Sequence, residues 1–100
     1  MAVKIPKSVT IGGRVIAVRV DPELDDWGQY RADTAEIVLS TKTVAKSADL
    51  RLTLRHEMLH AALDIGGISY MKHYDEEPIV RCIDHIFHPA WEQTRKQLTP

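Results

Sequence analysis

A long helical pattern in the second half of the chain carries two histidines one turn apart. Residues 50–65 repeat apolar side chains at spacings of three and four, and Gly66-Gly67 then forms a strong helix stop. Ser47 or Asp49 is expected to cap the N-terminus of this helix. Because apolar residues lie on more than one of its sides, we expect the helix to be central in the fold.

The first forty residues predict an antiparallel β-meander of about four strands. Residues 8–11 and 14–20 are joined by two glycines, which is typical of a hairpin, and residues 27–31 and 36–40 follow as two shorter strands. The second strand carries apolar residues on both faces, so we expect it to be central. A further helix is expected from residue 76 to about residue 88, with Pro89 kinking or restarting it before the last turns. The chain is therefore expected to be one α+β domain, residues 1–100, in which the sheet packs on the histidine-bearing helix and a C-terminal helix.

Composition limits the classes of protein to which the chain can belong. Hydrophobic residues make up 44% and charged residues 27%, which excludes a disordered or fibrous chain. The formal net charge of -1 lacks the basic surplus of nucleic-acid binders, so we expect no nucleic-acid partner. The single cysteine, Cys82, allows no intrachain disulfide, and no apolar stretch is long enough for a signal peptide or a membrane span. We expect a cytoplasmic protein without a membrane partner.

The string His56-Glu57-Met58-Leu59-His60 is the motif with the clearest chemistry. Residues four apart lie one above the other on a helix, so both imidazoles can reach one metal ion. Glu57 is turned about 100° from His56, where its carboxylate can contact a water on the metal without ligating the metal. Zinc lowers the pKa of such a water, and Glu57 can take its proton as a general base and later pass it to a leaving amine.

A fortuitous match in a protein without metal is the alternative interpretation of this motif. Two histidines and a glutamate in the middle of an apolar helix are costly unless they have partners. This cost favours a metal site, which we expect to hold Zn²⁺.

A catalytic zinc site needs a third protein ligand, and three residues are candidates. Glu76 lies in line with the apolar stripe of the second helix, where a carboxylate is unusual without a cation to meet. Glu77 is turned about 100° from that stripe, and Pro78 disfavours the helical conformation at Glu77. His73 lies in the preceding loop. We therefore rank Glu76 first, Glu77 second and His73 third, while both glutamates also suit a helix N-terminus without any metal.

The segment from about residue 28 to residue 87 resembles the small zincin-type metallopeptidases, in particular the ImmA/IrrE-like group and the short versions encoded by phages and prophages. The shared pattern is the strand Glu36-Ile-Val-Leu-Ser40, the run Leu54-Arg-His-Glu-Met-Leu-His60, and an acidic pair that begins an apolar helix. This resemblance implies a zincin-like fold, two histidine ligands, a glutamate base, and an acidic third ligand from the next helix. It also implies that a peptide substrate adds as a strand at a sheet edge, for which residues 36–40 are the candidate.

The spacing of thirteen residues from His60 to His73 is also similar to that of the SprT-like proteases, which use a third histidine. Those proteases usually have glycine after that histidine, whereas Tyr74 follows here, and no nucleic-acid-binding segment is visible. Tyr70 and Tyr74 are candidates to hydrogen-bond a tetrahedral oxyanion. The alternative is that both rings only pack against the core.

The function expected from these residues is hydrolysis of a peptide bond in a peptide or protein substrate, in the cytoplasm of a bacterial host if the chain is phage-encoded. The alternative is a binding or adaptor module that has the same frame and uses the metal only for stability. The sequence indicates neither the substrate nor the oligomeric state.

Overall fold

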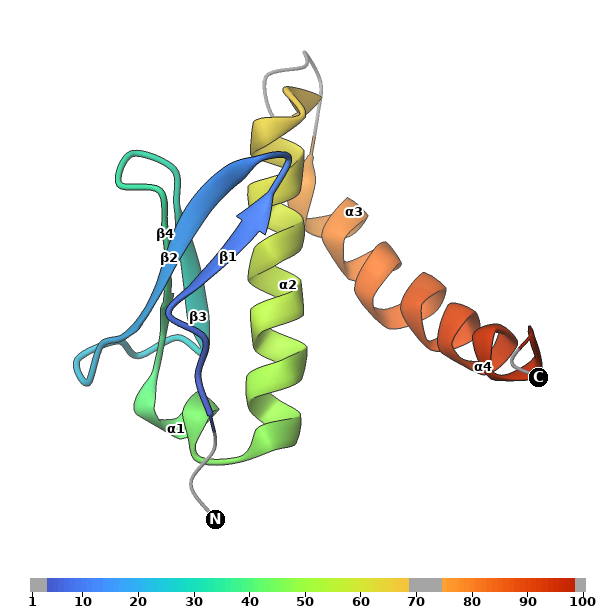
Figure 1. Cartoon of the computed structure of the whole chain (residues 1–100), viewed down its shortest axis with the longest axis horizontal. Coiled ribbons are helices and arrows are strands. Elements are labelled where there is room, and N and C mark those ends of the chain that lie inside the picture. Colours follow the sequence, from blue (N-terminus) through green and yellow to red (C-terminus); the bar gives the residue numbers. More distant parts are fainter. Residues whose placement is uncertain (1–3, 69–74, 99–100) are drawn as a thin grey trace.

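The computed structural model describes residues 4–68 and 75–98, which form an α+β fold with a four-stranded sheet (Figure 1). The strands are β1 (Ser8–Ile11), β2 (Arg14–Val20), β3 (Gly28–Arg31) and β4 (Glu36–Leu39). The helices are α1 (Thr41–Val44), α2 (Ser47–Ile65), α3 (Glu76–Cys82), the π-helix η2 (Ile83–Phe87) and α4 (His88–Leu98). The predicted class, with four strands before the helices, is confirmed.

The sheet has the order β1-β2-β4-β3 and is mixed, because β2 and β4 run parallel. The prediction of an antiparallel meander is therefore wrong for the middle of the sheet. Ile37, Val38 and Leu39 of β4 are fully buried, and such an apolar run is typical of a strand that is covered on both faces in the interior of a sheet. The more polar β3 takes the outer edge, and residues 21–27 carry the chain past β4 to reach it. Residues 36–40, expected at a sheet edge, lie inside the sheet instead.

The hairpin of β1 and β2 forms as predicted. Gly12 and Gly13 have φ values of 56° and 79°, a left-handed conformation that glycine adopts at little cost. β2 lies between β1 and β4, which confirms its expected central place. Its side chains alternate, so that Ile16 and Val18 are buried while Val15 on the other face is 65% exposed.

Helix α2 covers one face of the sheet, and the core lies between them (Figure 1). The buried core cluster consists of Ile16, Val18, Ile37, Leu39 and Leu50. The expectation that α2 would be central is wrong for its outer side, where Leu52 is 48% exposed. The C-terminal helices contact α2 through α3 and η2 and then project away from the sheet, which leaves part of the outer side of α2 uncovered (Figure 1).

The ends of α2 are formed partly as expected. Its N-cap residue is Lys46, which makes no side-chain cap bond, so the predicted caps at Ser47 and Asp49 are wrong. At the other end the helix stops at Gly66, and Gly67 follows with a φ of 79°. This confirms the predicted glycine stop.

Helices α3, η2 and α4 continue into one another. The backbone N–H of His88 bonds to the carbonyl of Ile83, five residues earlier. Pro89 has no N–H to give, and the wide turn before it accommodates its ring without ending the helix. Asp75 is the N-cap of α3 but makes no cap bond, and Glu77 lies within α3. The expectation that Pro78 would keep Glu77 out of the helix is therefore wrong, because Pro78 falls in the first turn, where its missing N–H has no helical partner to lose.

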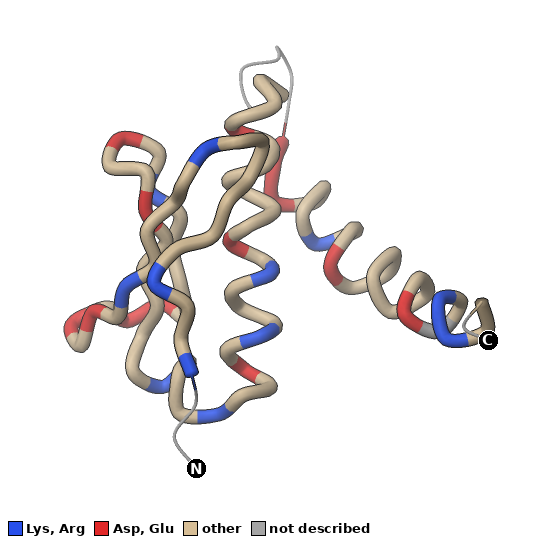
Figure 2. Tube along the Cα trace, in the orientation of Figure 1, with Lys and Arg blue, Asp and Glu red and all other residues tan. Residues whose placement is uncertain are grey.

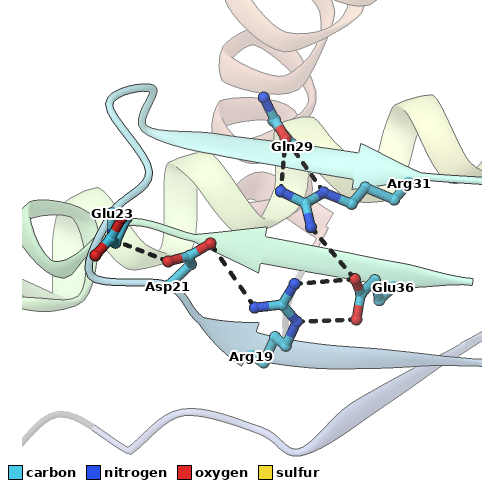
Figure 3. A network of polar contacts seen from close by, with 6 residues as sticks. All are labelled: Arg19, Asp21, Glu23, Gln29, Arg31 and Glu36. Carbon is cyan, nitrogen blue, oxygen red and sulfur yellow. Dashed lines mark hydrogen bonds and ion pairs between the residues drawn. The ribbon is translucent and has the colours of Figure 1, made fainter. Parts of the chain in front are cut away.

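The face of the sheet opposite α2 is covered by an ion-pair network (Figure 3). The guanidinium of Arg19 on β2 donates to both carboxylate oxygens of Glu36 on β4, at 3.0 and 3.1 Å. Arg31 on β3 lies 3.6 Å from the same carboxylate and also donates to Gln29. Basic and acidic residues are interspersed along the whole trace (Figure 2).

Candidate metal centre

Two imidazoles from α2 stand side by side where α3 and η2 meet α2. The ring centroids of His56 and His60 are 5.0 Å apart, and the ring planes make an angle of 66°. Their side chains are 25% and 15% exposed, so solvent reaches both rings. The helical spacing predicted from the sequence therefore places the two rings together.

Each of these rings has a carboxylate on its Nδ1 atom. Nδ1 of His56 lies 2.9 Å from Oδ2 of Asp84, and Nδ1 of His60 lies 2.5 Å from Oε1 of Glu76. An ionised carboxylate only accepts, so each Nδ1 carries the proton and donates it. The lone pair of His56 is then on Nε2, where a metal can bind. Nε2 of His60 also lies 2.7 Å from a carboxylate oxygen of Glu77, so it offers a lone pair to a metal only when it carries no proton.

Asp84 belongs to the π-helix η2 and is 9% exposed. Its Oδ1 accepts a hydrogen bond from Nε of Arg55 at 3.0 Å, and Nδ1 of His88 lies 3.8 Å from the same oxygen. Arg55 thus balances the charge of a carboxylate that is almost removed from solvent. Our sequence analysis missed Asp84. The available signal was its spacing of seven residues from Glu77, which is two helical turns.

Two of the three candidates for the third ligand, Glu76 and Glu77, form the acidic pair that begins α3. This pair lies beside α2 (Figure 2). Oε1 of Glu77 is 2.7 Å from Nε2 of His60, on the metal-binding side of that ring. One ligand atom from each of His56, His60 and Glu77 can be chosen so that all three lie within 4.8 Å of one another. Glu76 meets the opposite ring nitrogen of His60. His73, together with Tyr70 and Tyr74, lies outside the described residues.

The three-residue group has the right chemistry for zinc. Two imidazole nitrogens and one carboxylate oxygen are a donor set found in catalytic zinc sites, which leave the fourth position to water or substrate. The two Nδ1 contacts supply the outer hydrogen bonds that commonly fix such histidines. Residues His56, His60 and Glu77 therefore fit a divalent zinc ion.

Glu57 lies between the two histidines in sequence and is only 7% exposed. Burial raises the pKa of its carboxyl group, while the nearby His60 and His56 lower it. The burial is made by β3, which approaches α2 closely at Gly28. A Cβ atom at Gly28 would lie 2.9 Å from Cγ2 of Thr53 and 3.2 Å from Cγ of Glu57. Only glycine fits this contact without displacing a neighbour.

An open groove of about 860 Å³ runs past these residues between β3 and α2. His56, Glu57, His60 and Glu77 line one end of it. Trp27 and Leu52 line it as well, nearer the N-terminal end of α2. The candidate metal centre is therefore open to a molecule much larger than water.

The comparisons with known protein families, with curated proteins and with solved structures found no match to this chain. Among the described residues, no helix combines the length and the apolar character needed to cross a membrane.

Proposed function

We propose that this chain is a zinc-dependent metallopeptidase that hydrolyses a peptide bond. The observation that carries the proposal is the pair of histidines whose Nδ1 atoms both face carboxylates, with Glu77 on the Nε2 side of His60. These contacts fix the orientation of both rings, and the Asp84 contact also fixes the proton of His56 on Nδ1, before any metal arrives. Structural and catalytic zinc sites differ in whether a position is left for water, and three protein ligands leave one.

We propose Glu77 as the third ligand, in place of Glu76, which our sequence analysis ranked first. Glu77 supports this role because its carboxylate lies on the same side of His60 as the ring nitrogen that a metal needs. Glu76 then orients His60 through Nδ1, as Asp84 orients His56. The two acidic residues of α3 thereby take different roles at one imidazole.

The proposed chemistry needs one base, and Glu57 is suited to it. A zinc ion held by His56, His60 and Glu77 would supply a water of lowered pKa and a Lewis acid for the scissile carbonyl. Glu57 would be the base that accepts a proton from the attacking water and returns one to the leaving amine.

The substrate is proposed to lie along β3. Within the described residues, β3 pairs with β4 on one side only. The carbonyl of Trp27 accepts from the N–H of Ser40, and backbone direction alternates along an antiparallel strand, so Gly28 directs its N–H and C=O away from β4. These groups suit an added peptide strand at the groove, whereas β4, the segment first considered, is already paired on both sides.

The test compares Glu57→Gln with the wild-type protein. The variant should keep about one zinc per chain and lose turnover by about a hundredfold to ten-thousandfold, because an amide cannot accept the proton. Elemental analysis measures the zinc, with His60→Ala as the variant expected to lose it and His85→Ala as the matched histidine control that keeps it. Turnover is sought by terminal proteomics of a bacterial lysate incubated with each protein.

The alternative function is a binding or adaptor module with a zincin-like fold that the metal stabilises, without protease activity. A different result is expected for such a module. Zinc would then sit in a closed site without a water ligand, and wild-type and Glu57→Gln proteins would leave identical fragment profiles. A chain that stays free of zinc after reconstitution, with an unchanged melting temperature, would contradict both functions and favour a fortuitous motif.

A further inference from the structure

Trp27 is held in place although its side chain is 50% exposed. Its carbonyl accepts hydrogen bonds from the N–H of Ser40 at 3.1 Å and from Oγ1 of Thr43 at 2.6 Å. Nζ of Lys42 lies 4.7 Å from the centroid of its ring and also donates to the carbonyl of Asp25. The two hydrogen bonds fix the backbone of Trp27, and the Lys42 ammonium lies against its ring. An aromatic side chain has only two rotatable bonds to order, so it binds a partner at a low cost in conformational entropy. Trp27 therefore has the properties of a contact surface.

Leu52 lines the same groove from α2 and is 48% exposed. It precedes His56 by one turn and His60 by two, which is roughly 6 and 12 Å along the helix axis. An extended peptide advances about 3.3 Å per residue. A side chain that contacts Leu52 would therefore stand two to four residues from the bond held at the histidines.

At this end of the groove two lining carboxylates lie near the ammonium of Lys42, which contacts the Trp27 ring but is not itself a lining residue. Asp26 and Asp49 line the groove beside Trp27 and Leu52, and no lysine or arginine is among the described residues that line it. A zinc ion would offset carboxylates at the histidine end, but not these two. Lysine or arginine side chains on a bound peptide are favoured here over aspartate or glutamate.

We infer that Trp27 and Leu52 form a specificity subsite, which receives one bulky apolar side chain of an extended, positively charged peptide, two to four residues from the scissile bond. This inference rests on the proposed peptidase function and names the class of substrate. In this inference Trp27 is a residue that determines specificity.

The test is a binding selection that does not require cleavage. Random decapeptides, blocked at both ends and lacking histidine and cysteine so that they do not chelate zinc, are passed over immobilised, zinc-loaded Glu57→Gln protein. We expect the retained peptides to be enriched in leucine, phenylalanine or tryptophan at one position, and in lysine and arginine over aspartate and glutamate.

Variants then assign the preference to residues. Trp27→Ala and Leu52→Ala should each weaken binding of a retained peptide by about threefold to tenfold and remove the apolar preference. Trp91→Ala and Ile86→Ala are the matched controls, since both side chains are exposed and neither lines the groove. Asp49→Asn should reduce the preference for basic residues while keeping the apolar one.

The outcomes separate this inference from the function on which it rests. If wild-type protein never cleaves the retained peptides but Trp27 and Leu52 still govern their binding, the subsite stands and the peptidase function fails. If cleavage occurs and neither variant changes the peptide preference, the subsite is wrong and the peptidase function stands. Absence of any apolar enrichment, or equal weakening by Trp91→Ala, also overturns the subsite.

Discussion

Nδ1 of His56 donates a hydrogen bond to Asp84, a residue 28 positions later in the chain, across a distance of 2.9 Å. The contact joins α2 to the π-helix η2, and Arg55 holds the other oxygen of the same carboxylate. The tautomer of one proposed zinc ligand thus depends on a residue that ligates nothing. A π-helical turn is rare and often found at functional sites, and here it carries the carboxylate that faces the histidine.

Asp84→Asn should weaken zinc binding by about tenfold to a hundredfold, because the neutral amide is a poorer partner for His56 and for Arg55. The zinc affinity is measured by competition with a chromogenic chelator. Glu92→Gln is the control, since Glu92 pairs with the exposed Arg95 on α4 and should leave the affinity unchanged. Equal zinc affinities in Asp84→Asn and wild-type protein would show that the Asp84 carboxylate does not contribute to zinc binding through His56.

Gly28→Ala should lower the free energy of unfolding by about 1–3 kcal/mol, because the new Cβ overlaps Cγ2 of Thr53 and crowds Glu57. Chemical denaturation measures the loss. Removing the methyl group with Thr53→Ser in the same chain should recover part of it. A loss that the second change does not reduce would place the strain elsewhere than at this contact.

The ion-pair network on the outer face of the sheet gives the stability a pH dependence. The Arg19 side chain, through its hydrogen bonds, holds the pKa of Glu36 below its ordinary value. A lowered folded-state pKa stabilises the fold above the unfolded-state pKa, and this contribution is lost as pH falls through the folded-state pKa. Glu36→Gln should therefore lower the free energy of unfolding near neutral pH and have less effect in acid. Glu23→Gln is the exposed control, and a pH-independent effect of Glu36→Gln would contradict the ion-pair explanation.

The parts of this protein that sequence predicted well are local. The spacing of His56 and His60, the Gly12-Gly13 turn and the Gly66 stop depend on neighbours within a few residues, where helix and turn geometry decide the outcome. Strand order depends on contacts between distant segments. Burial of β4 between β2 and β3 was not deduced, although its uninterrupted apolar run and the polar character of β3 were the relevant signals.

The acidic pair shows the same limit at the level of single residues. The helical wheel correctly placed Glu76 nearer the buried side of α3 than Glu77, whose side chain is 56% exposed. It could not indicate which nitrogen of His60 each carboxylate meets, because that depends on how α3 packs against α2. The ranking of Glu76 rested on burial, whereas the proposal for Glu77 rests on which nitrogen of His60 each carboxylate meets.

Glu77→Ala should weaken zinc binding more than Glu76→Ala, because the first removes a proposed ligand and the second only an orienting carboxylate. We expect the Glu76 variant to lose about tenfold to a hundredfold in affinity and the Glu77 variant to lose more, both measured by chelator competition. Glu77→His should recover part of the affinity, since imidazole is also a zinc ligand, while Glu76→His should not. His73→Ala completes the set and should leave the affinity nearly unchanged. If Glu76→Ala loses more zinc affinity than Glu77→Ala, Glu76 is the better candidate for the third ligand. If His73→Ala loses the most, the site is SprT-like, with histidine as the third ligand.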